Sequence, residues 1–249
     1  TGDDVFTSTA GTMTITDLAL DDDQEVVTNA ATGIVDATLG GNWAATAATE
    51  NLAGNDDFTV RAGGTETVSL AAVDSGNGFT VVSTGTGAIT GSDDADLLTN
   101  TSGDAEFTGG TGDDVFTSTA GTMTITDLGV GGADVLVVTG GATANATVGD
   151  DYVATAATTN TGGAVTLFSD DFDVDLALVT GGDAGLSIDA SASTGAVTLV
   201  GTGYAEIIRG GDGNDIITGG AGADSLTGGA EADTFNFASA SELALDATV

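Results

Sequence analysis

Glycine, aspartate and one large apolar residue recur at a nine-residue spacing near the end of the sequence. The stretch Gly210–Phe237 reads GGDGNDIITGGAGADSLTGGAEADTFNF, and Gly-Gly pairs begin at Gly210, Gly219 and Gly228. In each nonapeptide an Asp stands at position six and a large apolar residue stands at position eight. Regularly spaced carboxylates, next to glycines that let backbone carbonyls approach closely, suit a hard cation that takes oxygen ligands.

The spacing also predicts how the nonapeptides are arranged in space. A six-residue turn followed by about three residues of strand makes half a coil, and two nonapeptides make a coil of eighteen residues. Coils stacked as parallel strands lie about 4.8 Å apart, so turns two units apart face each other and bring their carboxylates together. Like charges this close are unfavourable unless a cation lies between them. Because the chain has no His and no Cys, the ligands are oxygens at irregular geometry, which favours Ca²⁺ over Mg²⁺.

Nearly the whole chain is built from one repeated module. Residues 1–18, TGDDVFTSTAGTMTITDL, recur letter for letter at 111–128. The modules are therefore predicted at 1–110 and 111–220, with the start of a third at 238–249. Within each module a longer strand-like segment precedes a nonapeptide segment. The expected ranges are 8–90 in module one with 91–117 straddling the junction of the modules, and 118–200 and 201–237 for module two.

The segments 8–90 and 118–200 consist of short alternating runs such as TMTITDL, ETVSLAAV and AVTLF, separated by Gly, Asp, Asn and Ser. This pattern is typical of strands and turns. The sequence contains no Pro, which suits long hydrogen-bonded ladders. We therefore predict an all-β chain, an elongated parallel β-solenoid or β-roll with calcium-binding nonapeptide loops. Separate β-sandwich modules are the alternative for the two intervening segments.

The composition restricts the possible partners. Asp and Glu number 38 against two Arg, for a net charge of −36, which repels nucleic acid and anionic membrane surfaces. Hydrophobic residues make up 41% of the chain, enough to bury a core, so acidity here does not indicate disorder. No apolar run approaches the roughly 18 residues that a membrane-spanning helix needs.

Catalysis is not expected from this composition. Without His, Cys or Lys, the chain offers no Ser-His triad, thiolate nucleophile or Schiff-base lysine. Its acidic residues are so numerous that some pair of carboxylates will always be close enough for glycoside hydrolysis, and such a pair therefore indicates nothing. We expect a protein that is not an enzyme.

The run GGDGNDIIT-GGAGADSLT-GGAEADTFN resembles the calcium-binding nonapeptide array of RTX (repeats-in-toxin) proteins, which form a parallel β-roll. The resemblance covers about 91–117 and 201–237. In style, the intervening segments are similar to repetitive bacterial surface-layer proteins and large RTX adhesins.

The resemblance implies that the acidic residue at position six of each unit binds calcium together with its equivalent two units away. The implied pairs are Asp215 with Asp233, Asp224 with Glu206, and Asp96 with Asp114. Asp4 would be a further ligand if another segment supplied its partner loop. The unit 100–108 has Ala105 at this position and is not expected to bind metal. The turn glycines implied in these sites are Gly109, Gly112, Gly210, Gly213, Gly219, Gly222 and Gly228.

Together these features predict an extracellular structural protein, a calcium-stabilised repeat subunit of a self-assembling bacterial surface layer, matrix fibre or filament. The alternatives are a stalk repeat of a large RTX adhesin and the non-catalytic RTX region of a secreted hydrolase or toxin. The resemblance implies type I secretion to the cell surface or medium. The expected partners are copies of the same chain, with cell-surface polysaccharide as a further possibility.

Overall fold

The computed structural model describes residues 5–19, 26–30, 32–54, 57–73, 76–182 and 184–237. Its internal contacts divide the chain into two units, Thr1–Ile125 and Thr126–Val249. Regular structure in the described residues is β-strand, and no α-helix occurs among them. Within the same residues we find no helix with the length and apolar character that a membrane crossing requires.

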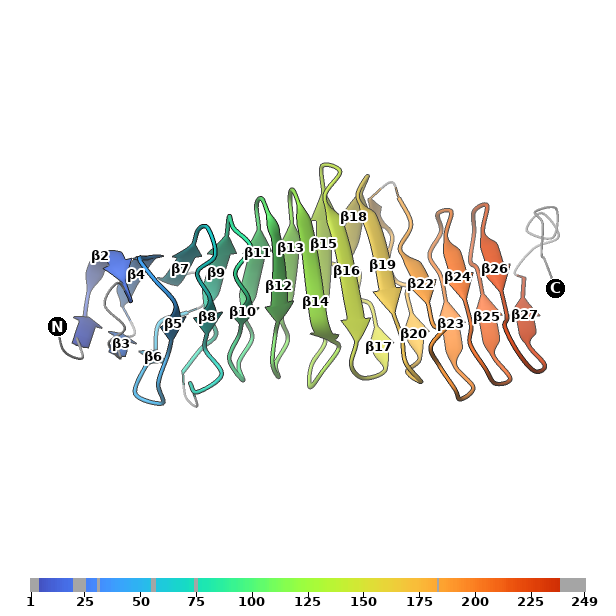
Figure 1. Ribbon diagram of the computed structural model, residues 1–249, viewed down its shortest axis with the longest axis horizontal. Coiled ribbons are helices and arrows are strands. Elements are labelled where there is room, and N and C mark those ends of the chain that lie inside the picture. Colours follow the sequence, from blue (N-terminus) through green and yellow to red (C-terminus); the bar gives the residue numbers. More distant parts are fainter. Residues whose placement is uncertain are drawn as a thin grey trace. The chain divides into compact units, whose positions relative to one another are not determined.

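The first unit is a parallel β-solenoid whose strands lie in three sheets, in the orders β1-β3-β6, β2-β4-β7-β9-β11-β13 and β5-β8-β10-β12-β14. Figure 1 shows its successive strands side by side, from blue to green. The strand bounds are β1 (Val5–Ser8), β2 (Gly11–Leu18), β3 (Val26–Asn29), β4 (Gly33–Leu39), β5 (Trp43–Ala44), β6 (Glu50–Asn51), β7 (Phe58–Ala62), β8 (Val68–Ser69), β9 (Thr80–Ser83), β10 (Ile89–Thr90), β11 (Leu97–Asn100), β12 (Asp104–Thr108), β13 (Val115–Ser118) and β14 (Thr122–Leu128), which crosses the boundary.

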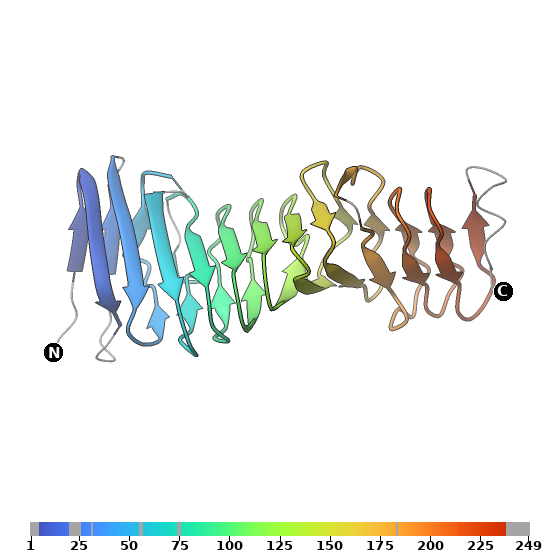
Figure 2. The ribbon, with the colours of Figure 1, turned by 90° about the horizontal axis from the view of Figure 1, so that it is seen from above.

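The second unit is also a parallel β-solenoid. Its sheets have the orders β15-β18-β21, β16-β19-β22-β24-β26 and β17-β20-β23-β25-β27. Figure 2 shows the turns that join the strands of its orange and red coils. The strand bounds are β15 (Val135–Thr139), β16 (Thr143–Val148), β17 (Tyr152–Val153), β18 (Thr159–Thr161), β19 (Ala164–Phe168), β20 (Val174–Asp175), β21 (Gly181–Gly182), β22 (Ser187–Asp189), β23 (Thr198–Val200), β24 (Ile207–Arg209), β25 (Ile216–Thr218), β26 (Ser225–Thr227) and β27 (Thr234–Asn236).

The coils differ in length, and the register shows that the coils of the intervening segments are the longer ones. In the nonapeptide segments Leu97 pairs with Val115 and Ile216 pairs with Thr234, eighteen residues later in both cases. In the intervening segments Val137 pairs with Thr159, 22 residues later. The additional residues of the longer coils include a further short strand, such as β17. The intervening segments are thus solenoid coils, as predicted.

The core is the row of side chains that alternate inward along each strand. Of the position-eight residues in the nonapeptides, Leu98, Phe107, Phe116, Ile208, Ile217 and Leu226 are buried. Each packs directly above its equivalent in the next coil, as Leu98 does above Phe116 and Ile208 above Leu226. Phe235, the last of the series, is half-buried. This stacking of apolar residues sets the register and therefore the position of every turn.

Candidate calcium-binding turns

The turns of the second nonapeptide segment join strands of three residues, as the spacing predicts. The turns are 201–206, 210–215, 219–224 and 228–233, and they lie alternately on the two edges of the coil, between β23, β24, β25, β26 and β27. In the first unit, turn 91–96 leads into β11 and turn 109–114 leads into β13, both on the same edge.

The first glycine of each nonapeptide makes room for oxygen atoms. The backbone of Gly210 is not in the left-handed region, but a Cβ at this position would collide with the Asp215 carboxylate and with the carbonyl oxygen of Gly228. Gly109, Gly219 and Gly228 face the carboxylate of their own turn in the same way, those of Asp114, Asp224 and Asp233 respectively. Close approach, not dihedral freedom, therefore requires glycine at position one.

Glycine is required at position four for a different reason. Gly112, Gly213 and Gly222 have φ of +121°, +122° and +131°, a region that L-residues rarely adopt. A Cβ on any of them would also meet the backbone of the turn eighteen residues earlier. Successive turns are therefore stacked backbone on backbone, which places their carbonyl oxygens next to the position-six carboxylates.

The position-six carboxylate of Asp215 connects two coils. Its Oδ1 accepts a hydrogen bond from the N–H of Val197 at 3.0 Å, and its Oδ2 accepts one from the N–H of Gly211 at 3.0 Å. The side chain is fully buried. Asp96 has the same arrangement, with the N–H groups of Phe79 and Ser92 each at 2.6 Å.

The structure brings each predicted pair of acidic residues into adjacent turns. Asp233 Oδ1 accepts a hydrogen bond from the N–H of Asp215 at 3.1 Å. Asp224 Oδ1 accepts from the N–H of Glu206 at 3.0 Å, and Asp114 Oδ1 accepts from the N–H of Asp96 at 2.8 Å. These are the three pairs that the resemblance to RTX repeats implies. Asp4 lies outside the described residues.

Burial of these carboxyl groups changes their protonation. It raises the pKa of Asp96 to about 6 and that of Glu206 to about 7. Hydrogen bonds from Ser92 and Thr202, respectively, oppose the shift. Both groups are thus more easily protonated than ordinary carboxyls, and a bound cation would favour their charged forms.

Each column of carboxylates ends on an apolar side chain. The residues that stack against Asp96 and Asp215 one coil earlier are Phe79 and Val197, both buried. The pairing of Ile188 with Ile208 places the buried Leu186 next to Glu206 in the same way. Within the described residues, the coil before each predicted pair therefore supplies no further carboxylate to that pair.

The donor set in these turns fits calcium. No group of three or more acidic side chains in the described part of the chain could hold a metal by itself, so a cation must take most of its ligands from the backbone. The convergence of the Gly228 carbonyl and the Asp215 carboxylate beside Gly210 supplies such oxygens. The carbonyl of Gly219 and the carboxylate of Glu206 converge beside Gly201 in the same manner. Mixed carboxylate and carbonyl oxygen is the ligand set that Ca²⁺ prefers.

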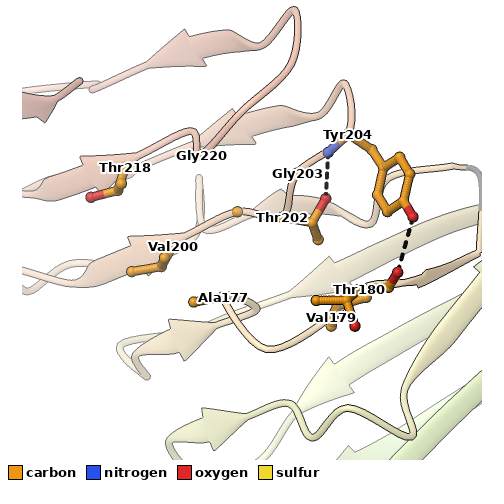
Figure 3. A pocket seen from close by; sticks show the side chains of 10 residues that line it. Ala177, Val179, Thr180, Val200, Thr202, Gly203, Tyr204, Thr218 and Gly220 are labelled. Carbon is orange, nitrogen blue, oxygen red and sulfur yellow. Dashed lines mark hydrogen bonds between the residues drawn. The ribbon is translucent and has the colours of Figure 1, made fainter. Parts of the chain in front are cut away.

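Two nonapeptides depart from the glycine pattern. Glu231 stands at position four of its turn and has φ +68°, the left-handed conformation without the freedom of glycine. Tyr204 stands at position four of the turn 201–206, and its hydroxyl donates to the carbonyls of Thr180 at 3.3 Å and Gly182 at 2.7 Å. Figure 3 shows the Tyr204 ring beside Val179 and Thr180, at the side of a pocket of about 520 Å³. The ring thus fastens this turn to the wider turn of the preceding coil.

One buried turn of the same pattern lies outside the predicted nonapeptide segments. Residues 129–137 read GVGGADVLV, with glycine at positions one and four, Asp134 at six and Leu136 at eight. Asp134 is buried, and its Oδ2 accepts a hydrogen bond from the N–H of Gly129 at 2.7 Å. The pattern was visible, but it lies alone inside a segment interpreted as strands. Ala105, by contrast, is buried beside Met123 in the unit expected to bind no metal.

Comparison with known families agrees with this geometry. Residues 200–235 match the family model of the RTX calcium-binding nonapeptide repeat, in four copies. A search of curated proteins and a search of solved structures each found no match. The matched segment contains the turns 201–206, 210–215, 219–224 and 228–233. These turns are therefore calcium-binding motifs, and calcium is the cofactor they take.

Proposed function

We propose that this chain, whose residues 200–235 are RTX calcium-binding nonapeptide repeats, is an extracellular, non-catalytic structural protein. Its repeats would form a calcium-stabilised subunit of a surface layer, matrix fibre or filament that assembles from copies of itself. RTX repeat proteins are typically secreted by the type I route, which supports an extracellular location. Calcium would neutralise part of the −36 charge and hold the turns of adjacent coils together.

One observation carries the proposal of self-assembly. The identical strands 5–8 and 115–118, both VFTS, are in different environments. In the second, β13 pairs with β11 and Phe116 is fully buried. In the first, β1 pairs within the described residues only with β3, Val5 is 70% exposed and Phe6 is half-buried. At 115–118 this strand sequence packs between coils, which supports an assembly in which repeats of this kind stack on one another.

The proposal is tested by light scattering and electron microscopy of the chain during a calcium titration, with reversal by chelator. We expect ordered particles that grow with calcium. Phe6→Lys places a charge where the equivalent Phe116 is buried and should abolish growth. Val5→Lys adds the same charge to the outward face of the same strand and serves as the matched control. A chain that binds calcium but stays monomeric would overturn the proposal and favour a repeat from an adhesin stalk.

A further inference from the structure

The coils outside the RTX turns have a second kind of corner, which contains no carboxylate. Four asparagines lie fully buried in strands: Asn29, Asn51 and Asn100 are the last residues of β3, β6 and β11, and Asn160 is the middle residue of β18. We call them the corner asparagines. In the sequence they have no common period and stand among many other polar turn residues, so their shared role appears only in the fold.

Three of the corner asparagines make the same pair of hydrogen bonds. The Nδ2 of Asn160 donates to the carbonyl of Gly163 in its own turn at 3.1 Å and to that of Gly185 in the next coil at 2.9 Å. Asn51 donates to Gly54 at 2.9 Å and Gly78 at 2.6 Å. Asn100 donates to Gly103 at 3.3 Å and Ala120 at 3.2 Å. Each neutral amide therefore ties its own turn to the turn that follows in the stack.

Asn29 extends this arrangement to a fourth corner. Its Nδ2 donates to the side-chain oxygen of Asn51 at 3.3 Å and to the carbonyl of Asp57 at 3.0 Å. Consecutive corners of the first unit are thus linked through amide groups alone. No charge is buried at these hydrogen bonds, so their formation needs no cation.

The acidic corners also tie coils together, but with negative charge. Asp215 and Asp233 lie in adjacent turns and connect through one backbone N–H, as do Glu206 and Asp224 on the opposite edge. Without a cation, the repulsion between such neighbours and the cost of burying them oppose the hydrogen bonds that they make. These corners therefore depend on calcium in a way that the corner asparagines do not.

The two kinds of corner are distributed unevenly along the chain. In 201–236 the turns on both edges are acidic. In 91–117, Asp96 and Asp114 lie at the turns on one edge of the coils. On the other edge, the Asn100 amide connects the turns. The coils around Asn51 and Asn160 have asparagine at the corner, and of the described turns in 32–54, 57–73 and 118–200 only 129–134 carries a buried carboxylate, that of Asp134.

From this distribution we infer that the protein has a graded response to calcium, with asparagine-cornered coils that keep their fold when calcium is withdrawn. The coils of 201–236 loosen first, and those of 91–117 respond less because one edge remains tied by Asn100. The inference rests on the proposed calcium binding and adds where along the chain calcium acts. Calcium-free protein would thus retain folded coils onto which the RTX coils close when calcium returns.

Hydrogen exchange of the full chain, followed by mass spectrometry in millimolar calcium and in excess chelator, tests the inference. We expect chelation to lower the protection of backbone amides in 207–227 by about tenfold or more, and that of 58–62 and 164–168 by less than about threefold. Equal loss of protection across all three segments would overturn the inference. Absence of any calcium effect would overturn the proposed function as well, so the two failures are distinguishable.

A variant gives an independent test. Asp215→Asn removes one charge from the Asp215–Asp233 pair and keeps an oxygen that can accept from Val197. In chelator, the backbone amides of 216–236 should exchange more slowly in this variant than in wild type. In calcium, the same amides should exchange faster than in wild type. Asp212→Asn removes the same charge from an exposed position of the same turn and should change neither. Slower exchange in chelator with the control variant, or faster exchange in chelator with Asp215→Asn, would contradict the inference.

Discussion

The carboxylate of Asp233 accepts a hydrogen bond from the backbone N–H of Asp215, eighteen residues earlier, at 3.1 Å. The carboxylate of Asp215 in turn accepts from the N–H of Val197, again eighteen residues earlier. The carboxylate of Asp215 thus binds the backbone of the coil before it, while the backbone N–H of the same residue donates to the carboxylate of the next coil. Buried charges arranged in this way stabilise the stack only when a cation compensates their repulsion.

Loss of one ligand should weaken calcium binding on one edge. Asp224→Asn removes a charge from the Glu206–Asp224 pair, and we expect the affinity of one site to fall by about tenfold or more, which is about 1.4 kcal/mol. Isothermal titration calorimetry measures the change. Asp212→Asn, exposed in the neighbouring turn, controls for the loss of charge alone. Equal effects of the two variants would mean that net charge, and not ligation, determines binding.

Glycine at position one should be irreplaceable even by alanine. A Cβ on Gly210 would meet the Asp215 carboxylate and the Gly228 carbonyl, so Gly210→Ala should lower the free energy of unfolding by about 1–3 kcal/mol. Gly203→Ala is the matched control, because no atom lies within 4 Å of its added Cβ. This control should be neutral, or stabilising by about 0.4–1 kcal/mol through the unfolded state. Calorimetric unfolding in calcium distinguishes the two substitutions.

Glu231 should be a site where glycine stabilises the protein. Its φ of +68° costs about 1–2 kcal/mol for an L-residue. Glycine removes this strain, but it also raises the conformational entropy of the unfolded chain, which offsets part of the stabilisation. We expect Glu231→Gly to raise the free energy of unfolding by about 0.5–1 kcal/mol. Ala230→Gly, one residue earlier, should lower it by a similar amount. A destabilised Glu231→Gly would show that the contact of its carboxylate with Asn214, at 3.4 Å, outweighs the backbone strain.

The calcium-free protein should become less stable as the pH rises from about 4.5 to about 7. Burial raises the pKa of Glu206 from 4.5 to about 7, so in this range the folded form holds a proton that the unfolded form has lost. Stability from this group is complete below pH 4.5 and is lost as the pH passes the folded pKa. Unfolding midpoints in chelator should fall over this window, and Glu206→Gln should reduce the fall. The same slope in both proteins would assign it to other carboxyls, such as Asp96.

The sequence alone was sufficient for the repeat, the parallel coil and the calcium-binding turns. Spacing determines these features, because a period of nine residues places Ile217 and Leu226 in the core and Asp215 and Asp224 at the turns wherever the coils stack. The length of a coil follows from the same period, and the resemblance to RTX repeats implied the three carboxylate pairs.

Only the tertiary structure could decide which groups meet between coils of unequal length. Asn160 reaches Gly185 and Asn51 reaches Gly78, 25 and 27 residues away, and no sequence period indicates these distances, since a third strand lengthens the coils between them. The sequence likewise does not indicate the burial that raises the pKa of Glu206, or the left-handed backbone conformation of Glu231. The period of the sequence is a local property of the chain. Burial, electrostatic repulsion and the hydrogen bonds between corners depend instead on which residues of the neighbouring coil lie next to each turn.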